Sequence, residues 1–432
     1  MDFITYLQEQ MIALLPGMLE TYAGDVRVES LSVLEKAVQQ LSQAVGQAVM
    51  TQVLEAQEPR YAPDEVLCPH CGQAGHYVRR REGTVLSLQG RVKYRRRYYL
   101  CSACGKGHHP LDERLGIEPG QMSQEVVQIA ALLGINASFE TSRDLLARTL
   151  GLELSANSIR KACQIMGERV ITREAQQYRA SQDLEGQRQH RREGGPQRLY
   201  GSMDGFMVLF EDGWHEMKSG AWWTVDDQGQ AHIAQYYVEA ASAEAFGELV
   251  WTTGFAQHAD QAQELVFITD GAEWIERLIA QHFPHAVTIV DWFHAAAYLT
   301  PVAPLAAATA DDQAHWLERA RADLWEGRLD AVIQACLRCA RPHLKVDDDP
   351  AQIAVRYFTN QRHRLDYPSY RAQGYSLGSG VMESACKQLG LQRLKIAGAR
   401  WGQDRQTARR VAKARAAYLS GQWEALAACP AA

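Results

Sequence analysis

Three acidic residues stand in segments where a metal-dependent nuclease would need them. Asp204 interrupts the apolar run SMDGFMVLF, Asp270 ends ELVFITD, and Glu383 lies in the helix-forming stretch GVMESACKQL. An acid among apolar residues costs free energy unless it is paired or binds a cation. Three converging carboxylates can hold two Mg²⁺ ions, or Mn²⁺ in their place, about 3.5–4 Å apart, which is the arrangement for in-line displacement at phosphorus. The acids therefore predict DNA strand cleavage and joining, although aspartates beside glycines also form ordinary turns.

The elements around these acids predict an α/β catalytic core. The segments LYGSMDGFMVLF, HEMKSGAWWTVD and AHIAQYYVEA read as three antiparallel strands, and two further strands, ELVFIT and AVTIV, each follow or precede a helical stretch. This order is typical of an RNase H-like core, with spatial strand order 3-2-1-4-5. The fourth strand then adjoins the first, while the fifth lies about 10 Å from it. Asp270 is therefore favoured over Asp291 as the partner of Asp204.

Four of the nine cysteines form two CxxC pairs with the spacing of a zinc ribbon, namely Cys68, Cys71, Cys101 and Cys104. Two such pairs can supply four thiolates to one tetrahedral structural Zn²⁺. The residues between the pairs alternate as two strands around Gln89-Gly90. We expect a module that needs its metal in order to fold. The other CxxC pair, Cys336 and Cys339, has no partner pair and is interpreted as core packing, as are Trp316 and Trp325.

Helical periodicity frames these two chemical segments. Three helices are expected at 122–133, 139–150 and 156–170, and the last two resemble a helix-turn-helix that presents its final helix to a DNA major groove. A purely structural helical bundle is the alternative. The resulting organisation is a helical region suited to self-association at 1–60, a zinc ribbon at 61–115, a helix-turn-helix at 116–172, a linker at 173–197, and a core at 198–294 and 377–432 interrupted by an all-helical insertion at 295–376.

Positive charge is concentrated locally although the net charge is −6. Eight Arg or Lys residues lie between Tyr77 and Tyr98 against one acid, and nine lie between Lys387 and Arg415 against one acid. Phosphates respond to the local field, so both segments indicate double-stranded DNA as a partner. The candidate DNA-binding residues are Arg95, Arg96, Arg97, Arg160, Lys161, Arg393, Lys395, Arg400 and Trp401. No uncharged apolar run is long enough to span a membrane, and a cytoplasmic, nucleoid-associated protein is expected.

The motifs SMDG, ITDGAEWI, IVDWFHAAAYL and RLKIAGARW, in this order, resemble those of bacterial insertion-sequence transposases of the ISKra type, which are related to Mutator-like DDE transposases. The resemblance covers most of the chain and is weakest over its first 55 residues. It implies a DDE triad of Asp204, Asp270 and Glu383, with Asp291 and His294 in the family's D/C-x-x-H motif.

The same resemblance implies an enzyme that binds terminal inverted repeats and works as a homodimer or higher oligomer on transposon ends and target DNA. Two alternatives remain at this point. One is a non-catalytic DNA-binding regulator that uses the zinc ribbon and helix-turn-helix alone. The other is a repair or junction nuclease that cleaves without joining.

Overall fold

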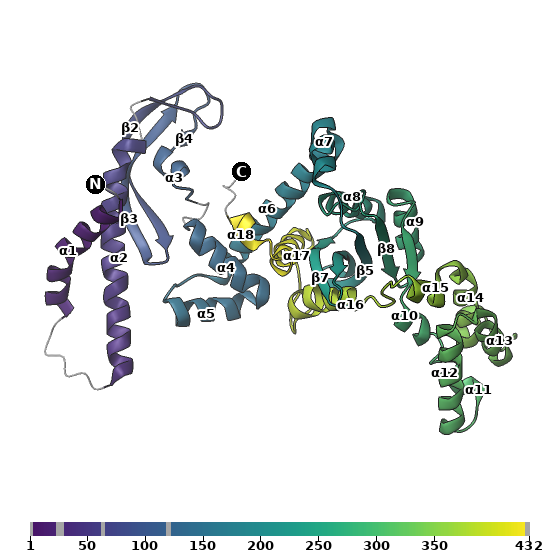
Figure 1. Ribbon diagram of the computed structural model, residues 1–432. Helices are drawn as coiled ribbons and strands as arrows, with labels where there is room; N and C mark the ends of the chain where they lie inside the picture. Colours follow the sequence, from purple (N-terminus) through teal and green to yellow (C-terminus); the bar gives the residue numbers. More distant parts are fainter. Residues whose placement is uncertain (1–2, 23–29, 62–64, 118–121, 428–432) are drawn as a thin grey trace. The chain divides into compact units, whose positions relative to one another are not determined.

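A computed structural model describes residues 3–22, 30–61, 65–117 and 122–427 of the 432-residue chain (Figure 1). Contacts divide the chain into two compact units, residues 1–169 with 425–432, and residues 170–424. Each unit is described separately below. Within the part of the chain that the structure describes, no helix is long and apolar enough to cross a membrane.

The first unit begins with two helices and a four-stranded antiparallel ribbon. The helices are α1 (Phe3–Tyr22) and α2 (Leu31–Tyr61), and the ribbon has the order β1 (Glu65–Leu67), β2 (Ala74–Ser87), β3 (Gly90–Cys101) and β4 (Gly107–His108). The long β2–β3 hairpin turns at Gly90, whose φ of 96° suits glycine. Its apolar face packs Val85, Val92 and Tyr94 on Leu111 of α3 (Pro110–Arg114) and on α2. This small core holds the hairpin together, and the cysteine pairs lie at the end of the hairpin opposite its turn.

Three helices follow at nearly the predicted positions: α4 (Gln124–Asn136), α5 (Phe139–Leu150) and α6 (Ala156–Gln182). Ser123 and Ser138 accept the backbone N–H groups of Val126 and Thr141, so each begins its helix as an N-cap. The linker expected at 173–197 is largely helical, which corrects that prediction. Helix α6 continues to Gln182, and Asp183 then caps α7 (Leu184–Glu193). The polar residues of this segment lie on exposed helix faces, and Asp183 is the residue type that begins a helix.

The second unit contains a five-stranded mixed sheet. Its strands are β5 (Arg198–Phe210), β6 (Gly213–Val225), β7 (Ala231–Glu239), β8 (Glu264–Thr269) and β9 (Val287–Val290). Their spatial order, β7-β6-β5-β8-β9, is the predicted 3-2-1-4-5 order, and β5 pairs in parallel with β8. Helices α8 (Ala243–Ala256) and α9 (Glu273–His282) bury Phe246 and Leu278 against Trp222 and Phe267 of the sheet. This core fixes the strand ends that carry the aspartates.

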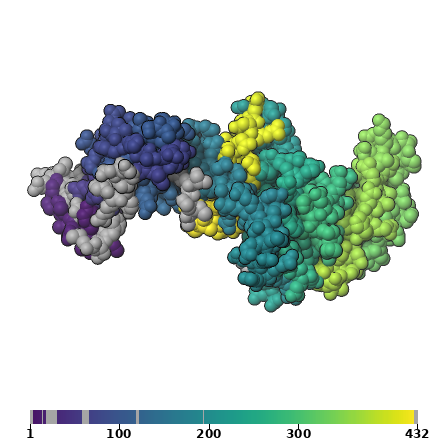
Figure 2. All heavy atoms as spheres, turned by 90° about the horizontal axis from the view of Figure 1, so that it is seen from above, coloured from purple at the N-terminus to yellow at the C-terminus, as the bar shows by residue number. Residues whose placement is uncertain are grey.

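Residues 292–372 are helical, as expected. They form α10 (Trp292–Ala297), α11 (Ala303–Ala306), α12 (Ala310–Trp325), α13 (Leu329–Cys339), α14 (Pro350–Asn360) and α15 (Tyr367–Ala372). In the second unit α11 to α14, light green in both views, stand away from the sheet as a lobe (Figures 1 and 2). Cys336 is buried in α13, as predicted, but Trp325 is 37% exposed and stacks edge-on against Trp292, so it is not a core residue.

The chain returns to the sheet through α16 (Gly380–Cys386), which continues directly into a π-helical segment, Lys387–Leu394. Helix α16 contacts β5 and β6. Two more helices follow, α17 (Gln406–Leu419), which packs on β7, and α18 (Trp423–Ala427). Glu383 therefore returns to strand β5, 179 positions after Asp204 in the sequence (383 minus 204).

Candidate active site and candidate metal centre

Three aspartates lie at neighbouring strand positions along one edge of the sheet. Gly201 of β5 pairs with Phe267 of β8, and continuing that parallel register by three residues places Asp204 beside Asp270. Thr269 pairs with Val290 of β9, so Asp270 and Asp291 are the next residues of adjacent strands. Asp204 and Asp291 are thus separated by a strand, as the predicted order required.

A cavity of about 620 Å³ lies above these strand ends. Its walls include the four acids and the histidine singled out in the sequence, together with two lysines. The members are Asp204, Asp270, Asp291, His294, Glu383, Lys387 and Lys395. The structure therefore brings residues from β5, the ends of β8 and β9, α10 and α16 to one place.

The environment of Asp204 disfavours its ionised form. Burial raises the pKa of its carboxyl group, and the negative charge of Asp270 adds to the rise. Hydrogen bonds only partly offset this: Oδ1 accepts the Gly205 N–H at 2.7 Å, and Oδ2 accepts the Cys386 thiol at 3.4 Å. Asp204 and Asp270 are therefore suited to share a hard cation, because its positive charge would stabilise both carboxylates.

Glu383 lines the same cavity and is paired with a lysine. Its side chain is 70% exposed, and Oε1 lies 2.7 Å from Nζ of Lys387, one helical turn further on. Among the described residues, the three acids do not form a group whose ligand atoms all lie within 4.8 Å of one another. Asp204 and Asp270 could hold a metal ion together, and Glu383 would join them by exchanging Lys387 for the cation.

Asp291 is already occupied by hydrogen bonds. Its side chain caps α10 by accepting the His294 N–H at 2.8 Å, and it accepts both the backbone N–H and the hydroxyl group of Ser379, the latter at 2.7 Å. Ser379 is the residue before α16. Asp291 therefore holds the start of the Glu383 helix against the end of β9, a positioning task. The His294 ring lies beside Tyr298 and lines the cavity.

Replacing Asp291 with alanine should lower the free energy of unfolding by about 2–4 kcal/mol, because it removes a buried carboxylate that accepts three hydrogen bonds. Asp291 is only 5% exposed, whereas Asp366 is an exposed N-cap on α15. Asp366→Ala should therefore cost about 1 kcal/mol. Urea unfolding followed by tryptophan fluorescence measures both values. Equal losses in the two variants would contradict the assignment of Asp291 as a buried clamp.

The helical region between β9 and α16 also supports this site, through residues that no sequence pattern indicated. Tyr357 donates its hydroxyl group to the Asp270 carbonyl at 3.0 Å, and Gln361 donates to the Gly271 carbonyl at 3.0 Å. Tyr367 donates to the Val290 carbonyl at 3.1 Å. These contacts span 77 to 90 positions, so no local pattern signals them. Ser379 and Cys386 could have been found, since they flank Glu383 at helical spacing.

The four cysteines predicted to bind metal are clustered in the ribbon. Their sulfur atoms all lie within 4.8 Å of one another, with Cys68 to Cys104 at 3.7 Å and Cys71 to Cys101 at 3.5 Å. Ligands about 2.3 Å from a tetrahedral zinc ion are about 3.8 Å apart. A backbone N–H from Cys104 helps lower the pKa of Cys101 to about 7. The group could hold a metal ion such as zinc.

The ribbon's arginines are not equivalent. Arg80 faces Arg97 across the hairpin and Arg81 faces Arg96, and such like-charged pairs are destabilising without a counter-charge. Asp112 pairs with Arg96 at 2.6 Å, so this predicted DNA contact is mostly committed inside the protein. Arg95 is exposed. In the helices, Lys161 is exposed and Arg160 is hydrogen-bonded to Asn157.

Two of the four residues predicted to bind DNA near the C-terminus are buried. Arg393 is 2% exposed and lies over the Trp401 ring, and Trp401 is 6% exposed with its indole N–H donated to the Leu394 carbonyl. Neither side chain is available to a DNA base, because both anchor the π-helical segment. Arg400 is exposed but donates to the Glu211 carbonyl. Lys395 is exposed at the cavity rim, where a phosphate can reach it.

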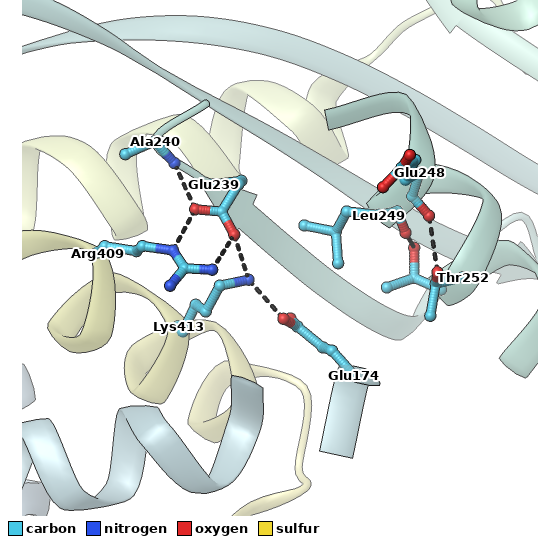
Figure 3. A network of polar contacts seen from close by, with 9 residues as sticks. Glu174, Glu239, Ala240, Glu248, Leu249, Thr252, Arg409 and Lys413 are labelled. Carbon is cyan, nitrogen blue, oxygen red and sulfur yellow. Dashed lines mark hydrogen bonds and ion pairs between the residues drawn. The ribbon is translucent and has the colours of Figure 1, made fainter. Parts of the chain in front are cut away.

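Other cations of that segment form a buried network (Figure 3). Lys413 of α17 has a side chain with 0% exposure and lies 2.6 Å from Glu174 and 3.1 Å from Glu239. Arg409 donates two hydrogen bonds to Glu239, at 2.5 and 2.8 Å. Burial alone would raise the pKa of Glu239, but Arg409 and Lys413 lower it to about 2. These charges stabilise the fold and are not a DNA-binding face.

Replacing Lys413 with methionine should lower the free energy of unfolding by about 3–5 kcal/mol, because two buried acids lose their shared cation. The exposed pair Arg328–Asp323 gives a control, and Arg328→Met should cost under about 1 kcal/mol. Since the pKa of Glu239 is lowered from 4.5, its contribution is complete above pH 4.5 and declines toward pH 2. Burial raises the pKa of Glu174, so its pairing with Lys413 is lost at a higher pH than that of Glu239. The wild-type advantage over Lys413→Met should therefore shrink progressively as the pH falls toward 2 in urea titrations; a constant gap would contradict the assignment.

One family model matches the chain over residues 28–425, that of the Uncharacterised protein family (UPF0236). The match includes the ribbon, the three helices after it, the sheet, the helical lobe and α16. A comparison with curated proteins finds no match.

Proposed function

The chain belongs to the uncharacterised family UPF0236, and on that premise we propose that it is a transposase that cuts and rejoins DNA strands with divalent metal ions. Asp204, Asp270 and Glu383 are the proposed metal-binding acids. The ribbon and the helices α4 to α6 are proposed to bind the terminal inverted repeats of an insertion sequence. Because two ends must be joined, a homodimer or higher oligomer is part of the proposal.

The observation that carries the proposal is the cavity shared by these acids. Asp204 and Asp270 stand on adjacent parallel strands, and Glu383 enters from a helix that contacts β5. The strand order β7-β6-β5-β8-β9, with a helical lobe between β9 and α16, is the order expected for an RNase H-like core. Both features support an RNase H-like assignment, which stays part of the proposal.

The chemistry proposed for this cavity needs oxygen donors and a route for phosphate. Mg²⁺ ions bound by the acids would activate the attacking oxygen and stabilise the leaving one. The carboxylates of Asp204 and Asp270 are the oxygen ligands that Mg²⁺ prefers. Lys387 and Lys395 on the cavity wall attract the DNA backbone and, as point charges, read no sequence. Lys387 also neutralises Glu383 until a cation takes its place.

DNA binding is proposed for the ribbon because its two long strands concentrate arginine side chains on one hairpin. Arginines face arginines across β2 and β3, and the exposed Arg95 lies on the same hairpin. A two-stranded ribbon and a helix both fit a DNA major groove. A local concentration of positive charge attracts the phosphates of a polyanion.

A direct test incubates zinc-loaded protein with a labelled DNA fragment that carries the flanking repeat, with Mg²⁺ or with EDTA. We expect nicks at the repeat boundary that require Mg²⁺, and 3′ ends that join a target plasmid. Tight binding without cleavage would instead favour a non-catalytic DNA-binding regulator. Cleavage without joining would favour a repair or junction nuclease.

A further inference from the structure

A thiol lies directly against the proposed metal site. Cys386 is on α16 three residues after Glu383, so the two side chains share one face of the helix. Its sulfur donates to Asp204 Oδ2 at 3.4 Å and lies 3.6 Å from the hydroxyl group of Ser219. Ser219 is the residue that pairs with Asp204 across β5 and β6, and it is fully buried.

These contacts join the two structural elements that carry the proposed ligands. Ser219 also approaches the Asp204 carbonyl at 3.5 Å, so thiol, hydroxyl and carboxylate form one small group. The Gly205 N–H holds the other carboxylate oxygen, Oδ1. Asp204 is therefore restrained at both oxygens, and one of the two restraints comes from the helix that bears Glu383.

We propose that Cys386 is a positioning residue that sets the orientation of the Asp204 carboxylate and the distance of the Glu383 helix from it. The inference rests on the proposed function, because it assigns Cys386 a role in preparing that metal site. Asp291 binds Ser379, the residue directly before α16, and Cys386, the last residue of α16, binds Asp204. Because α16 is held at both ends, the distance of Glu383 from the strands is fixed.

The alternative explanation is that Cys386 only fills space, and its chemistry argues against this. The sulfur contacts Asp204 Oδ2 and the Ser219 hydroxyl group at the same time, and the thiol is the donor to the carboxylate. Serine keeps a donor of similar shape at this position, and alanine removes the donor. A role in packing alone would make serine the worse substitute, whereas a role in orientation makes alanine the worse one.

The test measures Mn²⁺ binding by the electron paramagnetic resonance signal of the free ion, using full-length, zinc-loaded protein without DNA. Removing a partner that orients a metal ligand typically lowers metal affinity about 10–100-fold. Because a thiol is a weak donor, we expect Cys386→Ala to raise the Kd for Mn²⁺ about tenfold and Cys386→Ser to stay within about twofold of wild type. Cys336→Ala, which truncates a buried cysteine in α13, should leave the Kd unchanged.

Two sets of results would overturn the inference, and they are distinguishable. If Asp204→Asn removes Mn²⁺ binding while Cys386→Ala binds like wild type, or if Cys386→Ser binds as weakly as Cys386→Ala, Cys386 has no positioning role and the proposed metal site stands. If the wild type shows no saturable Mn²⁺ binding that Asp204→Asn removes, the proposed metal site itself fails. Melting temperatures of all variants separate a loss of affinity from a loss of fold.

Discussion

Asp204→Asn and Asp270→Asn should each lower the rate of DNA strand cleavage by about 10³-fold or more, which corresponds to about 4 kcal/mol of lost transition-state stabilisation. Asparagine keeps the shape of the side chain and removes the charge that a divalent cation needs. DNA affinity should change little, because the proposed DNA-binding residues of the ribbon lie on other elements. Single-turnover cleavage of an end-labelled repeat fragment, read on a sequencing gel, measures the rate.

The stability of these variants separates a catalytic role from a structural one. Because burial and the charge of Asp270 raise the pKa of Asp204, ionised Asp204 is a cost to the metal-free fold. Asp204→Asn should therefore melt at or slightly above the wild-type temperature while being inactive. Asp226→Asn is the matched control, since Asp226 accepts turn N–H groups after β6 and is remote from the cavity lining. It should cleave normally; an inactive Asp226→Asn or an active Asp204→Asn would remove the basis for the proposed site.

Local sequence patterns predicted the elements well because their signals are short-range. The apolar and aromatic runs of β5 to β7, the serine caps of α4 and α5, and the two CxxC pairs are each recognised from residues that are close in the sequence. The strand order followed from the element order alone and is observed. The linker prediction for 173–197 is wrong because polar composition is common to linkers and exposed helices, whereas the Asp183 cap is specific to a helix.

Side-chain partners are what the sequence could not predict. A cluster of cations has the same sequence pattern whether it faces solvent or a buried acid. Arg393 and Lys413 are buried, and Arg409 is paired with the acid Glu239. Their partners, such as Glu239 and Glu174, lie 170 to 239 positions away. The acids of the site were predicted because a carboxylate in an apolar strand is costly wherever it lies. The contacts that restrain them, through Ser379, Cys386 and Tyr357, depend on tertiary packing.

Removing the metal from the ribbon should unfold it and weaken DNA binding strongly. A structural zinc site supplies an apparent free energy of about 10–16 kcal/mol to a small domain, far more than the few apolar residues packed around Val92 can replace. Cys104→Ser leaves three thiolates and should lower zinc affinity by at least about 10³-fold. Zinc content by atomic absorption and DNA affinity by fluorescence anisotropy check both expectations, and acid should release the metal as the thiolates take up protons.

The chain supplies its own control in a second CxxC pair. Cys339→Ser alters a thiol in α13 that donates to the Ala335 carbonyl, and it should leave zinc content at one ion per chain. Since the ribbon and the sheet belong to different compact units, Cys104→Ser should also leave the thermal unfolding of the sheet unit in place. DNA binding that survives in Cys104→Ser with zinc absent would show that the ribbon is not the DNA-binding element. In that case α4 to α6 would have to bind the repeat alone, because the buried Arg393 and Trp401 cannot.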